Sequence, residues 1–209
     1  TDLVRLYPGN FYSYRNNGAG GFVPETAGSV FSQANVASSG SSINVSGRVS
    51  RDFTGDGNDD VVALATSRRP VFLGQDQEKF HFKLLKSING VLQEDYQFDT
   101  QQEFDHADYK YAIGDFDGDG AADLFVYLYD AHKGYFYSFK KHTQLNPVTD
   151  QDFGNSDVEF YAVDLNGDGK NEILVTYPGA PPYILDLNFF GSQFNLTNVA
   201  SNLSYPSNN

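Results

Sequence analysis

The chain has 209 residues, a net charge of −13 at pH 7, and no Cys, Met or Trp. The lack of Cys excludes a disulfide framework and a thiol nucleophile, and the acidic balance argues against a nucleic-acid partner. No segment approaches the roughly 20 consecutive apolar residues of a membrane-spanning helix, so we expect no membrane insertion.

Short apolar runs rich in β-branched and aromatic residues recur along the chain and predict strands. The first run is residues 2–7, and an aromatic run at 11–14 follows and leads into an Asn-Gly turn. Residues 80–86 alternate with a period of two, as in a strand with one wetter face. No segment shows helical periodicity with caps, so the sequence predicts an all-β fold. The other predicted strands are residues 60–65, 123–129, 134–140, 172–177 and 182–187.

The same nine-residue pattern opens at three places along the chain, at residues 52–60, 115–123 and 164–172. Each copy begins with Asp, has an oxygen-bearing side chain at position 3, Asp-Gly at positions 5 and 6, and an acid at position 9. The copies start 63 and 49 residues apart, which is the period range of propeller blades and similar β repeats. The sequence therefore predicts a repeat protein.

The pattern places oxygen atoms where a hard cation can bind them. Oxygen ligands at positions 1, 3, 5 and 9 of a tight loop suit Ca²⁺, and the glycine at position 6 allows the sharp turn. Ordinary Asp-Gly turns do not account for an acid at position 9 in all three copies. Clustered carboxylates also repel one another without a cation, so we expect the chain to bind about three Ca²⁺ ions.

Two other calcium-binding loop types do not fit the pattern. An EF-hand needs a bidentate Glu at position 12 and a helix on each side. Position 12 is Ala63, Val126 or Val175, and each of them lies inside an apolar run. A nonapeptide β-helix would repeat every nine residues, which this chain does not do.

Residues 111–126 and 161–175 resemble the FG-GAP/VCBS repeat family, which includes the calcium-binding blades of integrin α-subunit propellers. Residues 11–22 look like the outer-strand Asn-Gly-x-Gly-x-Phe feature of the same family. The resemblance implies β-propeller-type repeats of short antiparallel strands with calcium-binding hairpin loops. A full propeller normally has more blades than the roughly four repeats found here, so we expect an incomplete or shared propeller.

The resemblance also implies three sets of calcium ligands. The first set is Asp52, Thr54, Asp56 and Asp60 with the carbonyl of Asn58. The second set is Asp115, Asp117, Asp119 and Asp123 with the carbonyl of Ala121. The third set is Asp164, Asn166, Asp168 and Glu172 with the carbonyl of Lys170. The second loop should bind most tightly, because it alone offers four carboxylates.

We expect a single β-repeat domain at residues 1–200, followed by a flexible tail at 201–209. The expected repeats are residues 2–42, 43–105, 106–155 and 156–200. The first begins in mid-repeat, because no calcium loop precedes it, and we expect another segment or another copy to complete it. A Ser-, Ala-, Asn- and Gly-rich stretch at 26–47 reads as a long connection between strands.

The sequence gives no sign of a catalytic site, and we expect the protein not to be an enzyme. His81, His106, His132 and His142 have no metalloprotease or deaminase spacing. A Gly-x-Ser-x-Gly nucleophile elbow is also missing.

The predicted function is a secreted or cell-surface calcium-binding module that mediates protein interaction, adhesion or assembly, with self-association or a protein partner. One alternative is a carbohydrate-binding, lectin-like module, because some of the many Tyr residues could form platforms for sugars. A second alternative is part of a carbohydrate-active enzyme, since a pair of catalytic carboxylates could exist outside the loops. Glycosylation of the Asn-x-Ser/Thr sequons at Asn44, Asn195 and Asn202 stays open.

Overall fold

The computed structural model describes residues 3–7, 10–29, 42–69, 77–99, 109–129, 132–149, 153, 157–178, 180–190 and 193–200. These residues form fifteen β-strands and no helix, which confirms the predicted all-β fold. Within the same ranges, no helix is long and apolar enough to cross a membrane. The chain divides into two compact units, Thr1–Ala107 and Asp108–Asn209.

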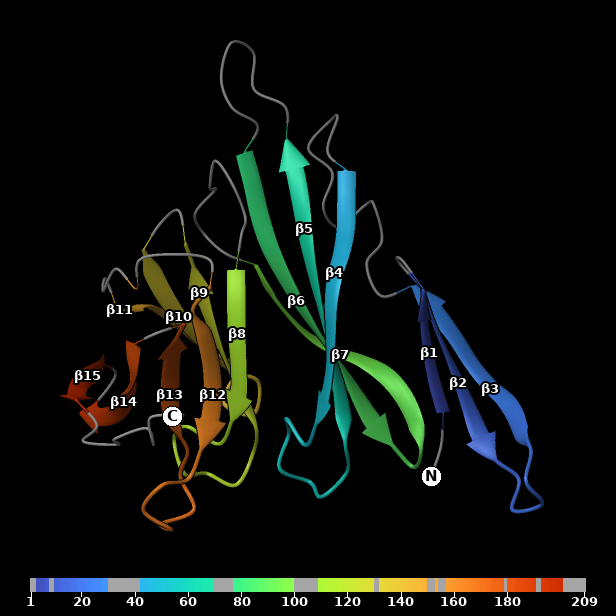
Figure 1. Ribbon diagram of the computed structural model, residues 1–209. Coiled ribbons are helices and arrows are strands. Elements are labelled where there is room, and N and C mark those ends of the chain that lie inside the picture. Colours follow the sequence, from blue (N-terminus) through green and yellow to red (C-terminus); the bar gives the residue numbers. More distant parts are fainter. Residues whose placement is uncertain are drawn as a thin grey trace, which may run out of the picture. The chain divides into compact units, whose positions relative to one another are not determined.

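The first unit contains two antiparallel sheets whose strands follow chain order (Figure 1). The strand predicted at residues 2–7 is present as β1 and pairs with β2. The three-stranded sheet is β1 (Leu3–Tyr7), β2 (Asn10–Asn16) and β3 (Phe22–Ser29). The four-stranded sheet is β4 (Ser42–Arg51), β5 (Asp60–Arg69), β6 (Gln77–Ile88) and β7 (Val91–Asp99).

The second unit contains two four-stranded antiparallel sheets, again in chain order. None of the four sheets of the described chain closes on itself, which is consistent with an incomplete propeller. One sheet is β8 (Tyr109–Gly114), β9 (Asp123–Leu128), β10 (Lys133–Ser138) and β11 (Thr143–Thr149). The other is β12 (Glu159–Val163), β13 (Glu172–Tyr177), β14 (Ala180–Phe190) and β15 (Gln193–Ala200).

The predicted connection at residues 26–47 is wrong at both ends, because β3 continues to Ser29 and β4 begins at Ser42. Residues such as Asn, Gly and Ala have a low propensity for strands, but pairing with a neighbouring strand overrides such local preferences. Residues 30–41 and the predicted tail at 201–209 lie outside the described residues. The extent of a single domain over 1–200 stays a prediction.

Aromatic packing joins the two sheets of the second unit. In the first of these sheets, Ala112, Phe125 and Phe136 lie side by side across β8, β9 and β10 and are buried. Phe160 of β12 packs against Phe125 and Tyr127, with ring centroids 5.4 Å apart in each pair. Burial of apolar surface contributes about 25 cal/mol per Å². These buried rings therefore stabilise the packing of the two sheets against each other.

Candidate metal centre

Each nine-residue loop joins the first two of the four strands of its sheet. We call residues 52–60 the first loop, 115–123 the second loop and 164–172 the third loop. They connect β4 to β5, β8 to β9, and β12 to β13, respectively.

The acid at position 1 folds its loop by accepting backbone N–H groups. Asp115 Oδ1 accepts from the N–H of Gly118 at 2.7 Å and of Asp119 at 3.0 Å, while Oδ2 accepts from Gly120 at 2.7 Å. Asp52 and Asp164 bind the backbone of their own loops in the same way. A carboxylate oxygen has two lone pairs, so these bonds leave capacity for a cation.

Two glycines in each loop have a backbone conformation that other residues rarely adopt. In the second loop they are Gly118 at position 4 and Gly120 at position 6, with φ of 74° and 81°. The turn-forming role predicted for the glycine at position 6 thus extends to position 4. Position 4 was missed, although it is glycine in all three loops and has positive φ in each.

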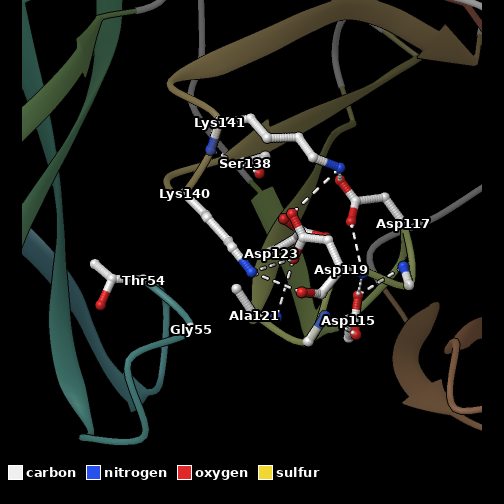
Figure 2. A network of polar contacts seen from close by, with 12 residues as sticks. Thr54, Gly55, Asp115, Asp117, Asp119, Ala121, Asp123, Ser138, Lys140 and Lys141 are labelled. Atoms are coloured by element: carbon white, nitrogen blue, oxygen red, sulfur yellow. Dashed lines mark hydrogen bonds and ion pairs between the residues drawn. The ribbon is translucent and has the colours of Figure 1, made fainter.

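The acids of the second loop lie close together (Figure 2). Asp115, Asp117 and Asp123 each place a carboxylate oxygen within 4.8 Å of the others. Asp123 opens β9 and is fully buried. Its Oδ2 accepts the N–H of Phe116 at 3.2 Å, whereas its Oδ1 is buried without a hydrogen bond of standard geometry, although the Ser138 side chain interacts with this carboxylate and lowers its pKa. Burial raises the pKa of Asp123 well above its ordinary value, and the Asp117 charge raises it further.

This donor set fits Ca²⁺. The ligands are hard carboxylate oxygens, and a buried carboxylate such as that of Asp123 is costly unless a cation or a proton compensates its charge. Burial also raises the pKa of Asp117, and the charges of Asp119 and Asp115 raise it further.

Two lysines of the turn between β10 and β11 reach into the acids of the second loop (Figure 2). Lys141 Nζ lies 2.5 Å from Asp117 Oδ2 and 3.2 Å from Asp119 Oδ2. Lys140 Nζ donates to the backbone carbonyl of Asp119 at 2.6 Å. Burial lowers the pKa of Lys141, but its hydrogen bonds to Asp117 and Asp119 outweigh this, so the net shift is upward. A metal ion in the second loop would therefore compete with these ammonium groups for the oxygen atoms of Asp117 and Asp119.

In the first loop, the acid at position 9 has different hydrogen-bond partners from its counterpart in the second loop. Asp60 Oδ2 accepts the N–H groups of Phe53 and Thr54, both at 3.1 Å, and Oδ1 accepts the N–H of Ser87 at 2.9 Å. Both Asp60 oxygens are thus already bonded, although burial raises the pKa of this acid. Thr54 Oγ1 is buried, and the Thr54 side chain interacts with the Asp60 carboxylate and lowers its pKa.

Asp56, the fifth residue of the first loop, is bound from two sides. Asn58 donates to Asp56 Oδ1 through its backbone N–H and its side-chain amide, both at 3.0 Å. These bonds lower the pKa of Asp56. Lys86 Nζ lies 3.2 Å from Asp56 Oδ2, so a lysine again faces the acid at position 5.

In the third loop an amide takes the place of the lysine. Asn166 Nδ2 donates to Asp168 Oδ2 at 3.0 Å and to Glu172 Oε1 at 3.1 Å. The amide must rotate to offer its oxygen to a metal. Glu172 Oε2 accepts the N–H of Leu165 at 2.9 Å.

The structure therefore brings the acids of the second loop together more completely than those of the other two. The carbonyls of Asn58, Ala121 and Lys170 stay predicted ligands, and the backbone N–H of each residue donates to the acid at position 5 of its own loop. Sequence reasoning missed Lys86, Lys140 and Lys141. The adjacent Lys140 and Lys141, in the turn between β10 and β11, were the sequence feature that could have indicated a positive charge near the second loop.

Comparison with known families gives two matches. Residues 115–175 match the FG-GAP-like repeat, and residues 160–192 match the FG-GAP repeat. No curated protein matches the chain. The FG-GAP resemblance inferred from the sequence is thus confirmed for residues 115–192, which include the second and third loops.

Removing the competing lysine should change the second loop in two ways. In chelator, Lys141→Ala should lower the melting temperature, because Asp117 and Asp119 lose their counter-charge. Calcium affinity of the second loop should rise about two- to five-fold, since a partly exposed ion pair contributes roughly 0.5–1 kcal/mol. Calorimetric titration measures this, with Lys133→Ala in the same hairpin as the control. Equal affinities of the two variants would contradict the competition.

The buried acids set a pH dependence for the metal-free protein. Burial raises the pKa of Asp60, Asp117 and Asp123, so above about pH 4 the folded chain holds protons that the unfolded chain has released. Their stabilisation is complete below the unfolded pKa of about 3.9 and is lost as pH rises through the folded pKa.

Urea unfolding in chelator at several pH values measures this dependence. The free energy of unfolding should fall less with rising pH in Asp123→Asn than in the unchanged protein, because the amide mimics the protonated acid. Identical slopes for the two proteins would show that Asp123 titrates normally.

Proposed function

We propose that the chain is a calcium-stabilised, non-enzymatic FG-GAP interaction module. The observation that supports it best is the second loop, where Asp115, Asp117 and the buried Asp123 each place a carboxylate oxygen within 4.8 Å of the others. Asp115, Asp117, Asp119 and Asp123 would hold the ion, and the third and first loops would hold two more. The cation would supply the positive charge that offsets repulsion among these acids.

In this proposal the metal stiffens a scaffold that is already folded. The position-1 acids bind the backbone N–H groups of their own loops, so these hydrogen bonds hold each turn in shape independently of the ion. Calcium then replaces Lys141 and Lys86 as the partner of the fifth-position acids. The loop ends become rigid, and the hairpins can present a fixed surface to a protein partner or to another copy of the chain.

A secreted or cell-surface setting fits this role. Extracellular calcium modules bind with dissociation constants on the order of 10⁻⁴ to 10⁻³ M, and sites that contain their own ammonium competitor need calcium at such concentrations. The proposal therefore places the module where calcium is near millimolar.

Exposed aromatic side chains favour a carbohydrate-binding module as the second candidate. Tyr111 on β8 and Tyr161 on β12 are 37% and 50% exposed, and a Tyr ring offers both a flat apolar face and a hydroxyl to a sugar. A glycan screen with and without calcium separates the two candidates. Glycan binding that is lost in Tyr161→Ala would favour the lectin-like role.

Calcium should raise the melting temperature of the protein by several degrees relative to excess chelator. At about 1 mM calcium, each site of the stated affinity contributes roughly 0.4–1.4 kcal/mol, so three sites contribute a few kcal/mol. Differential scanning calorimetry measures the shift, and superimposed curves would refute the proposal.

Among ligand variants, Asp119→Ala should reduce the shift more than Thr54→Ala, because it removes a charged ligand from the most acidic loop. The exposed Asp59, at position 8 of the first loop, is outside the ligand set, and Asp59→Ala is the matched charge control. A larger loss in Thr54→Ala would overturn the predicted ranking of the sites.

A further inference from the structure

One side chain of the third loop clamps the first acid of the second loop. Asn171 donates its backbone N–H to the carbonyl of Asp115 at 2.7 Å. Its side-chain Oδ1 accepts the backbone N–H of Asp115 at 2.8 Å. Both backbone polar groups of Asp115 are therefore bonded to a single residue that lies 56 positions further along the chain.

A glycine makes room for this clamp. A Cβ on Gly114, the residue before Asp115, would lie 2.5 Å from Asn171 Oδ1 and 2.6 Å from the Cβ of Ala162. These distances are too short for any real side chain, so β8 and β12 can approach each other here only because Gly114 has none. The clamp thus rests on both a matched pair of hydrogen bonds and a tight backbone contact beneath it.

The eighth position of the other loops does not offer the same group. It is Asp59 in the first loop and Ala122 in the second. Asp59 is exposed, and the Ala122 side chain has no polar atom. Asn171 is therefore a particular feature of the third loop and not a requirement of the nine-residue pattern.

The clamp connects groups on both candidate metal sites. Asp115 is the first ligand of the second site, and its carboxylate organises that loop through three backbone N–H groups. Asn171 directly precedes Glu172, the ninth ligand of the third site, which is 7% exposed. A metal that fixes Glu172 also fixes Asn171, and through it the backbone of Asp115.

We propose that Asn171 is a positioning residue that couples the second and third loops, so that metal bound in one loop raises the metal affinity of the other. The inference rests on the proposed calcium binding and adds its regulation. Coupling between sites is reciprocal. The sign of the coupling is informative. Two neighbouring divalent cations repel each other, so charge alone would make binding at one loop weaken binding at the other. A structural link through Asn171 would have the opposite effect.

The test is a double-mutant cycle on the full chain, titrated with calcium in a calorimeter. Asp168→Asn disables the third loop, and the affinity of the second loop is then measured with and without Asn171→Ala. With Asn171 present, disabling the third loop should lower second-loop affinity about five-fold, the lower end of typical coupling. With Asn171→Ala, the same change should have little effect. Asp59→Ala, at the same loop position, is the matched control and should leave the five-fold effect intact.

Amide hydrogen exchange in chelator gives a readout without metal. Asn171→Ala should speed exchange at the Asp115 N–H selectively, whereas a general loss of stability would speed exchange throughout the core. Asn171→Asp keeps an acceptor oxygen and should restore protection of the Asp115 N–H. Selective loss in the first variant and rescue in the second support the clamp, and equal protection in all three proteins overturns it.

The outcomes separate this inference from the proposed function. If calcium binds but Asp168→Asn leaves second-loop affinity unchanged, the coupling is overturned and the proposed function stands; this comparison does not need Asn171→Ala to fold. If Asp168→Asn lowers the affinity equally with and without Asn171, the role of Asn171 is overturned. If neither loop binds calcium, both the proposed function and the inference fail.

Discussion

A buried carboxylate at the start of the second strand is the constraint on which each hairpin depends. Asp60 and Asp123 are fully buried and Glu172 nearly so. Each accepts the N–H of the residue at position 2 of its own loop, Phe53, Phe116 or Leu165. Because this acid joins the two ends of the loop, it closes the turn and carries negative charge into the edge of the core. A buried charge is costly unless it is paired, so the loop both forms around the acid and needs a positive partner near it.

The side-chain donors that face the neighbouring acid at position 5 differ from loop to loop. Lys86 and Lys141 bring ammonium groups to the fifth-position acids of the first and second loops, whereas in the third loop the neutral Asn166 amide donates an N–H group to Asp168. Asp123 is fully buried, and burial still raises its pKa although the Ser138 side chain interacts with the carboxylate. Backbone N–H groups thus set the shape of the loop, while side-chain donors and, in our proposal, calcium offset its charge.

The local sequence pattern predicted most of the fold, because a strand or a nine-residue loop can be recognised from a short segment of sequence. The runs that became β5, β9 and β13 follow their loops directly. What depended on distant residues could not be predicted. Lys141 lies 24 residues from Asp117, and Asn171 lies 56 residues from Asp115, so their contacts follow from how hairpins and sheets pack. The strand ends at Ser29 and Ser42 were missed for a similar reason, since strand pairing outweighed weak local preference.

A crystal structure of the full chain grown with calcium near neutral pH, with the ion identified by anomalous scattering, tests the central claim most directly. Our account predicts an ion in the second loop bound by Asp115, Asp117, Asp119 and Asp123, with Lys141 Nζ displaced from its 2.5 Å contact with Asp117 Oδ2. An ordered second loop without an anomalous peak, in which Lys141 keeps that contact at millimolar calcium, would contradict it.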